Sequence, residues 1–284
     1  MSESVHRVLA GAVVMAMLIA GCDSTNEVAS TTTTQTPTST QAPTTTQVPA
    51  TTQVVTTPPA ASTEAVADSV AAKEGCEVTP AGPLLDARSP ARPYFLHHPT
   101  EASTDTATIM FLPGGSTGSR NAAERVWANY LSQGEGVDDF RVVIPYATGF
   151  DLYDDEERVL AIVEEVLACH GGDPSQFHIA GYSRGGQIAF GLMLRQPDLF
   201  ATALGAPGEF FLVEPDRWRE DLAGKAFFNG VGSEDEEWLP FVKAIHEGLV
   251  EAGVESVYVE FPGEGHRLSS EFDESIFFDF WSSH

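Results

Sequence analysis

The chain is poor in cysteine and in basic residues. It has three cysteines in 284 residues, and its 15 Lys and Arg face 41 Asp and Glu, which gives a formal charge of −26. Residues 76–284 alone carry 13 Lys and Arg against 35 Asp and Glu, and so a charge of −22. A surface this negative repels polyanions, so we expect no nucleic acid partner.

Motifs of the common cofactor-dependent enzymes are also missing. The sequence has no phosphate-binding loop, no glycine-rich dinucleotide turn after a first strand and no cysteine–histidine spacing typical of a metal site. His246-Glu247 begins like the helical zinc-protease motif, but Val250 stands where the second histidine is required. We therefore expect neither a metal nor a cofactor.

The apolar run near the N-terminus is too short to cross a membrane as a helix. It extends from Val8 to Ala20, follows Arg7 and fits the apolar region of a signal peptide. Ile19-Ala20-Gly21-Cys22 resembles the lipobox of bacterial lipoproteins, in which the cysteine is lipidated. We expect residues 1–21 to be a signal peptide and Cys22 to anchor an exported, extracytoplasmic protein to a bacterial membrane. The alternative is a secreted protein with an ordinary signal peptide.

Large apolar side chains are scarce in residues 22–75, where Thr, Pro, Gln, Ser and Ala dominate. Such a segment cannot bury enough surface to offset its ordering entropy, so we predict a disordered stalk. Residues 76–284 are enough for one domain with a full core. In an oxidising compartment Cys76 and Cys169 can form a disulfide; two unrelated buried thiols are the alternative.

Strand-like and helix-like segments alternate from about residue 94 to the end. Apolar, β-prone runs lie at Tyr94–Leu96, Ile109–Leu112, Val142–Ile144, Phe177–Ala180, Thr202–Gly205, Ala226–Val231 and Val257–Phe261. Apolar stripes with helical spacing lie in residues 159–167, 188–193, 239–249 and 276–281. Continuously apolar strands are buried on both faces. The pattern therefore predicts an α/β fold, a mostly parallel sheet with helices on both faces.

The most informative segment is Gly181-Tyr182-Ser183-Arg184-Gly185, which has the pattern G-x-S-x-G. A predicted strand precedes it and a helical stripe follows directly. In this context the pattern exposes a nucleophilic serine on a sharp turn. Gly181, Gly185 and Gly186 leave room for that turn. We predict that Ser183 is a nucleophile; an ordinary glycine-rich loop is the alternative.

A serine nucleophile needs a base to take its proton and an acid to orient that base. In a parallel sheet these groups follow the carboxyl ends of strands, in the order Ser, acid, His. Asp235 follows the sixth predicted strand and is our candidate acid, with Glu234 and Glu236 as competitors. His266 follows the last strand in a glycine-rich loop and is the candidate base.

The other histidines are expected to be structural. His97 and His98 lie on an early strand that we expect at an edge of the sheet. His178 lies in the strand before Ser183, and we expect it to pack in the core. His246 lies on a predicted helix and His170 follows one.

The transition state of acyl transfer also needs two backbone N–H groups that bind the oxyanion. One is expected from Arg184, directly after the nucleophile. The other is expected from Gly115, because Pro113-Gly114-Gly115-Ser116 follows the second predicted strand and glycines let a substrate approach the backbone. A simple Pro-Gly turn is the alternative for this loop.

These motifs together resemble the α/β-hydrolase family, and within it compact esterases related to polyhydroxyalkanoate depolymerases and feruloyl esterases. The resemblance covers roughly residues 90–284. It rests on LPGG, GGDPSQFHIAGYSRGG, QPDLFATAL, GSED and GEGH, of which GDPSQFHIAGYSRGG is the most specific. Many relatives have His-Gly where this chain has Pro113-Gly114.

The resemblance implies the same roles for the same residues. Ser183 would be the nucleophile, Asp235 the acid and His266 the base. Gly115 and Arg184 would form the oxyanion hole. We expect the fold of that family without a large lid.

The 52 positions from Ser183 to Asp235 leave no room for a large lid beside the strand and helix they must hold. An open site favours small or polymer-attached esters over long-chain fats. Phe210, Phe211 and Trp218 are candidates to line it, although core packing explains them equally well. We predict a serine hydrolase of carboxylic esters. The alternatives are a peptidase of the same fold and a non-catalytic cell-envelope binding protein.

Overall fold

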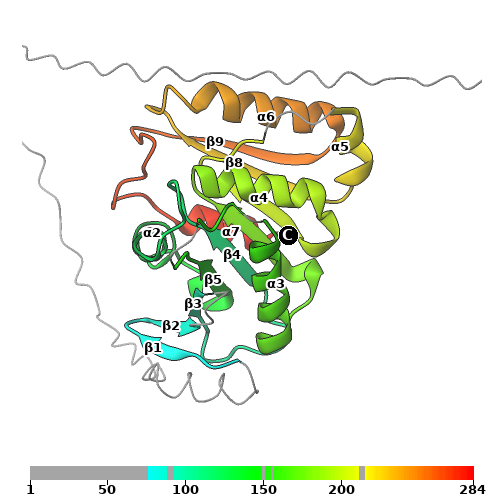
Figure 1. Cartoon of the computed structure of the whole chain (residues 1–284). Helices are drawn as coiled ribbons and strands as arrows, with labels where there is room; N and C mark the ends of the chain where they lie inside the picture. Colours follow the sequence, from blue (N-terminus) through cyan, green and yellow to red (C-terminus); the bar gives the residue numbers. More distant parts are fainter. Residues whose placement is uncertain (1–75, 88–92, 149–150, 155, 211–214) are drawn as a thin grey trace, which may run out of the picture. The chain divides into compact units, whose positions relative to one another are not determined.

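The computed structural model describes residues 76–87, 93–148, 151–154, 156–210 and 215–284 (Figure 1). The predicted signal peptide, the lipidation site Cys22 and the stalk of residues 22–75 lie outside the described residues. In the described part of the chain, no helix is both long and apolar enough to cross a membrane.

The described residues form one nine-stranded sheet in the order β1-β2-β3-β5-β4-β6-β7-β8-β9. The six strands from β5 to β9 in this order are parallel, and β1, β2 and β3 extend the sheet in antiparallel fashion. The strands are β1 (Thr79–Ala81), β2 (Leu84–Ala87), β3 (Tyr94–His97), β4 (Thr108–Leu112), β5 (Arg141–Pro145), β6 (Phe177–Gly181), β7 (Thr202–Gly205), β8 (Ala226–Gly232) and β9 (Glu255–Phe261).

The seven predicted strands are present as β3 to β9. Six of them are parallel and β3 is antiparallel, so the predicted mostly parallel sheet is confirmed. The prediction that His97 and His98 belong to an edge strand is wrong. β3 lies between β2 and β5, with His97 opposite Val142, because two unpredicted strands extend the sheet beyond it. In β2 the apolar run is interrupted by Asp86, whose buried carboxylate binds Arg120 at 2.9 Å.

Helices cover both faces of the sheet (Figure 1). In β4, Met110 belongs to the apolar cluster that contains residues of α3, α4 and α6, and Phe111 belongs to the cluster that contains residues of α2 and α7. This alternation explains why the strand is continuously apolar. The helices are α2 (Arg120–Val126), α3 (Glu156–His170), α4 (Arg184–Arg195), α5 (Pro215–Asp221), α6 (Leu239–Ala252) and α7 (Ser275–Ser282), with a π-helical turn η1 (Trp127–Leu131) and 3-10 turns η2 (Val137–Asp139), η3 (Pro174–Gln176) and η4 (Pro197–Leu199).

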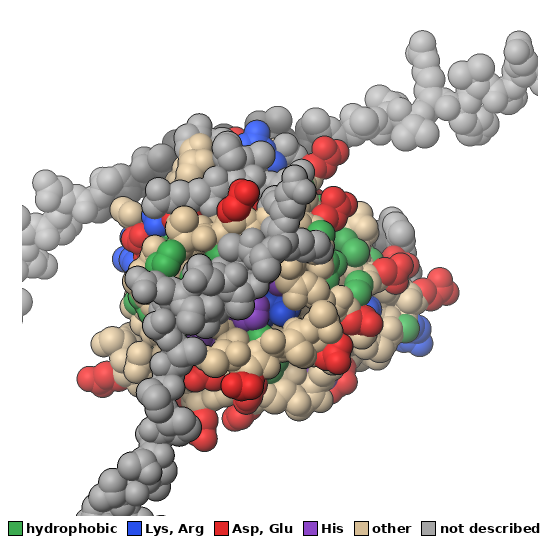
Figure 2. Space-filling model, turned by 90° about the horizontal axis from the view of Figure 1, so that it is seen from below, with side chains coloured by type: hydrophobic (Ala, Val, Ile, Leu, Met, Phe, Trp, Pro, Cys, Tyr) green, Lys and Arg blue, Asp and Glu red, His purple; other side chains and the backbone are tan. Residues whose placement is uncertain are grey.

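A disulfide joins Cys76, just before β1, to Cys169 near the end of α3, across a sequence separation of 93 residues. It fastens the beginning of the described chain to a helix of the core. On the outside, acidic side chains greatly outnumber Lys and Arg over the face seen in Figure 2. This distribution agrees with the negative charge of the sequence.

Candidate active site

Ser183 lies in the sharp turn between β6 and α4 and has a strained backbone. Its φ of 56° and ψ of −124° make it the one non-glycine residue with positive φ among the described residues. Such a conformation costs on the order of 1–3 kcal/mol and persists only where surrounding contacts hold it. Here the amide of Ser183 donates to the carbonyl oxygen of Pro207 at 2.8 Å. The turn presents the hydroxyl at the carboxyl edge of the sheet.

The glycines around Ser183 are required by close backbone contacts. A Cβ atom on Gly181 would lie 2.3 Å from the backbone of Gly185, and one on Gly185 would lie 2.1 Å from the carbonyl oxygen of Leu112. Gly186 would meet the carbonyl oxygen of Pro207 at 2.3 Å. Because these neighbours are backbone atoms, larger residues would displace the turn itself.

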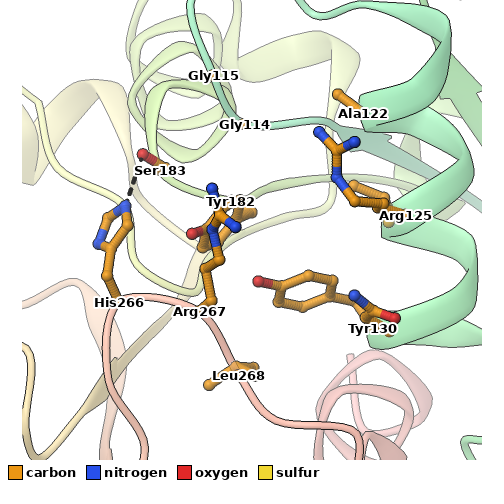
Figure 3. A pocket seen from close by; sticks show the side chains of 12 residues that line it. Gly114, Gly115, Ala122, Arg125, Tyr130, Tyr182, Ser183, His266, Arg267 and Leu268 are labelled. Carbon is orange, nitrogen blue, oxygen red and sulfur yellow. Dashed lines mark hydrogen bonds between the residues drawn. The ribbon is translucent and has the colours of Figure 1, made fainter.

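Ser183, His266 and Asp235 form one hydrogen-bonded chain across three loops. His266 Nε2 lies 3.0 Å from Ser183 Oγ, and His266 Nδ1 lies 2.7 Å from Asp235 Oδ2 (Figure 3 shows the first of these). A carboxylate accepts hydrogen bonds, so Nδ1 carries the proton of the neutral ring and Nε2 is left to accept from the serine. The three side chains come from the ends of β6, β8 and β9.

Asp235 is buried, whereas its competitors Glu234 and Glu236 are exposed. Its amide donates to the carbonyl oxygen of Gly232 at 3.0 Å, and its own carbonyl accepts from Leu239 at 2.9 Å. The turn after β8 and the start of α6 therefore hold the carboxylate in place.

Two aromatic rings flank the imidazole of His266. The centroid of Tyr182 lies 5.3 Å from that of His266, and the centroid of Trp238 lies 5.4 Å from it. Both rings restrict the rotation of the histidine. Tyr182 stands within the G-x-S-x-G motif and Trp238 directly before α6, and no sequence pattern singled out either residue.

The predicted oxyanion loop lies against the serine turn. Gly114 packs on the ring of Tyr182, where a Cβ atom would come within 2.4 Å of Cδ1. Gly115 is exposed and has a φ of 92°. In the described part of the chain, the structure gives the amides of Gly115 and Arg184 no hydrogen-bond partner. Both N–H groups are therefore free to bind a substrate oxygen.

A second loop, residues 151–154, holds the predicted oxyanion loop in place. The Arg184 side chain donates to the carbonyl oxygen of Ser116 and to Asp151 Oδ2, the latter at 3.0 Å. Its guanidinium also lies 5.2 Å from the ring centroid of Tyr153. The buried Tyr153 hydroxyl donates to the carbonyl oxygen of Pro113. Sequence analysis missed Asp151 and Tyr153, because only the fold brings their loop to this place.

The other histidines bond to residues outside the candidate triad. His178 is buried and bonds Thr202 at 2.9 Å, and burial lowers its pKa to about 4. His170 lies 3.0 Å from the Tyr94 hydroxyl, and His246 lies 2.8 Å from Ser256 Oγ. Their expected structural positions are thus observed.

Phe210 and Trp218 pack against one another in the core, with centroids 4.9 Å apart, and do not line the site. Phe211 lies outside the described residues. Among the described residues, no three His, Cys, Asp or Glu side chains gather closely enough to hold a metal ion.

A cavity of about 250 Å³ opens beside Ser183 and His266 (Figure 3). One wall comes from α2 and η1, which contribute Arg125 and Tyr130. The other comes from Tyr182 and from Arg267, the residue after His266. Sequence analysis did not identify this wall. Ala122, Val126 and Tyr130 have the spacing of an apolar stripe on a helix. This spacing predicts the helix but not where the helix lies relative to Ser183.

No protein-family model and no curated protein matches the chain. Solved structures do match it. A carboxylesterase from Mesorhizobium loti superposes with a TM-score of 0.54 at 20% identity, over 72% of this chain and 100% of that one. A ferulic acid esterase gives 0.52 at 18% identity, over 70% and 96% of the two chains. A thermostable esterase gives 0.51 at 17% identity, over 70% of this chain but 59% of that one. Together with the sheet order, these likenesses establish that the chain has the α/β-hydrolase fold.

Proposed function

We propose that the protein is a serine hydrolase that cleaves carboxylic esters through an acyl-enzyme. The observation that carries the proposal is the imidazole of His266, which lies within hydrogen-bonding distance of both Ser183 and the buried Asp235. The fold supports it, since solved structures of the same fold are described as a carboxylesterase and a ferulic acid esterase.

In the first half of the reaction, Ser183 Oγ attacks the ester carbonyl carbon while His266 Nε2 takes the hydroxyl proton. The carbonyl oxygen becomes an oxyanion and is bound by the amides of Gly115 and Arg184. One such donor contributes about 3–4 kcal/mol to transition-state stabilisation. Asp235 stabilises the imidazolium that has formed. The intermediate then collapses, and the alcohol leaves with the proton from His266.

In the second half, water replaces the alcohol. His266 removes a proton from the water, whose oxygen attacks the acyl carbon bound to Ser183. The same two amides bind the second oxyanion. Collapse releases the carboxylic acid and returns the proton to Ser183 Oγ, which restores the free enzyme.

We further propose that the enzyme is exported and lipid-anchored through Cys22, with residues 22–75 as a stalk. The support is the lipobox-like sequence. The disulfide between Cys76 and Cys169 agrees with it, because such bonds persist mainly in oxidising compartments. In a bacterial host, the full chain should sediment with membranes, and Cys22→Ser should abolish lipidation. Equal membrane association and unchanged mass of the two forms would contradict the anchor.

The test of the activity is covalent labelling with a fluorophosphonate probe, together with turnover of 4-nitrophenyl acetate. Ser183→Ala should abolish labelling and lower kcat by about 10⁶-fold. The exposed Ser175 supplies a matched control, because Ser175→Ala makes the same chemical change away from the site. Faster turnover of aminoacyl amides than of short esters would indicate a peptidase instead. A chain that neither labels nor turns over would be a binding protein.

A further inference from the structure

The cavity beside Ser183 differs in charge from the rest of the domain. The domain carries 35 Asp and Glu against 13 Lys and Arg, yet among the described residues two arginines and no acidic residue line this cavity. Arg125 enters it from α2, and Arg267 enters it from the loop after β9 (Figure 3). These two cations thus reach the cavity from two separate segments beside the candidate nucleophile.

Arg125 has no carboxylate partner among the described residues. Arg120, on the same helix, is different: it pairs with Asp86 at 2.9 Å and with Glu124 at 3.3 Å. The positions three and four residues from Arg125 hold Asn121, Ala122, Ala128 and Asn129, so no acidic residue stands where a helix brings a partner to it, and the adjacent Glu124 pairs with Arg120. Its guanidinium is therefore available to a ligand.

Arg267 also lacks a carboxylate partner among the described residues. Burial raises the pKa of Tyr182, while hydrogen bonds with Tyr130 and Arg267 act in the opposite direction. Glu264, the nearest acidic residue before Arg267 in the chain, is engaged by the amide and hydroxyl of Ser269 at 2.6 and 2.7 Å. In the described part of the chain, no carboxylate therefore neutralises Arg267.

The size and chemistry of the cavity limit the ligand. A volume of about 250 Å³ is below that of most ligand pockets and accommodates a short acyl or alcohol group. Guanidinium groups match carboxylates in geometry and bind them with charge-assisted hydrogen bonds. Both arginines are exposed at the mouth of the cavity, so a neutral group would leave them to the solvent, whereas a carboxylate would gain their charge-assisted hydrogen bonds.

We propose that the substrate of this site is a short ester whose acid or alcohol part carries a carboxylate, bound by Arg125 and Arg267. This proposal rests on the proposed ester hydrolysis and specifies its substrate class. The negative charge of the domain repels anions at long range. The two arginines therefore have to supply the attraction locally.

The test compares charged and neutral esters of matched size. For the acid part, mono-4-nitrophenyl adipate is compared with 4-nitrophenyl hexanoate. For the alcohol part, 4-acetoxybenzoate is compared with its methyl ester. In at least one pair the charged ester should have a kcat/KM about tenfold higher at low ionic strength. The pair that responds identifies which part of the substrate carries the anion. The preference should shrink as salt is added.

The double variant Arg125→Gln with Arg267→Gln should lose this preference, so that the ratio of charged to neutral kcat/KM falls to one or below. A ratio within each variant cancels any general loss of folded or active protein. The double variant Arg219→Gln with Lys243→Gln, an equal change of charge at exposed positions of α5 and α6, should keep the wild-type ratio. A wild-type ratio of one or less, or the same ratio in the double variant of Arg125 and Arg267, would overturn the inference. If the protein hydrolyses none of the four esters, the proposed ester hydrolysis itself is refuted.

Discussion

Tyr153→Phe removes one hydroxyl group from the loop behind the predicted oxyanion hole. That hydroxyl donates to the carbonyl oxygen of Pro113, two residues before Gly115. The ring itself remains, so the cation–π contact with Arg184 and the packing in the core are kept. The substitution therefore tests the hydrogen bond alone.

Tyr153→Phe is expected to lower both the stability of the protein and its kcat. A buried carbonyl group without its partner destabilises the protein by about 1–3 kcal/mol, which lowers Tm by a few degrees in a domain of this size. Complete loss of an oxyanion donor costs about 10²–10³-fold in kcat. Arg184 still donates to the carbonyl oxygen of Ser116, so the loop that carries Gly115 keeps one of its two hydrogen bonds. We therefore expect kcat to fall only about tenfold. KM should change less than twofold, because the cavity walls are untouched.

The assay measures kcat, KM and Tm with 4-nitrophenyl acetate as substrate. Tyr94→Phe is the matched control: it also removes the hydroxyl of a buried tyrosine, here one that lies 3.0 Å from His170 and outside the cavity. It should lower Tm without lowering kcat. If Tyr153→Phe lowers Tm but leaves kcat at the wild-type value, the loop behind the oxyanion hole does not position Gly115, and the reasoning is refuted.

Three further substitutions test other parts of the argument. Asp235→Asn should lower kcat by about 10⁴-fold while the fold is kept, because an amide stabilises the wrong tautomer of His266; a loss below tenfold would contradict that role. Burial lowers the pKa of His178 to about 4, so between pH 6.5 and 4 the unfolded chain binds a proton that the native protein excludes. Stability is therefore complete above pH 6.5 and falls as the pH is lowered, and urea unfolding should show wild type losing about 2 kcal/mol more than His178→Gln from pH 7 to pH 5. Replacing both Cys76 and Cys169 by Ser should cost about 2–5 kcal/mol of unfolding free energy, and an unchanged urea midpoint would show that the bridge does not constrain the unfolded chain.

The central sheet could be predicted because its strands are buried on both faces and read as apolar runs. β1 and β2 were not predicted because they do not read as apolar runs. β1 is three residues long and contains Pro80, and β2 carries the charged Asp86 in its interior. That carboxylate is tolerated only because Arg120 and Tyr146 bind it from distant parts of the chain. Without knowledge of those partners, a buried charge argues against a strand.

The position of the candidate triad could be predicted because topology orders it. Parallel strands bring their carboxyl ends to one edge, so the loops after β6, β8 and β9 must meet there. The choice of Asp235 over Glu234 and Glu236 depended on a one-residue difference in a turn, and burial now separates them. The contacts of His266 with Tyr182 and Trp238, and the hydrogen bond of Tyr153 with Pro113, depend on tertiary packing. Sequence spacing does not predict them.

The net charge of the domain predicts how its surface acts on large ligands, but it does not predict the charge inside the cavity. A charge of −22 on the domain argues against polyanions, because a long ligand meets the summed field of the surface. It does not argue against a small anion in a cavity. At physiological salt the field of a surface charge decays within about 8 Å, so the groups that line a cavity of about 250 Å³ determine the potential inside it. Those groups are Arg125 and Arg267, whose meeting beside Ser183 depends on the fold. The proposed carboxylate preference beside Ser183 is therefore compatible with the expectation that the surface repels nucleic acid.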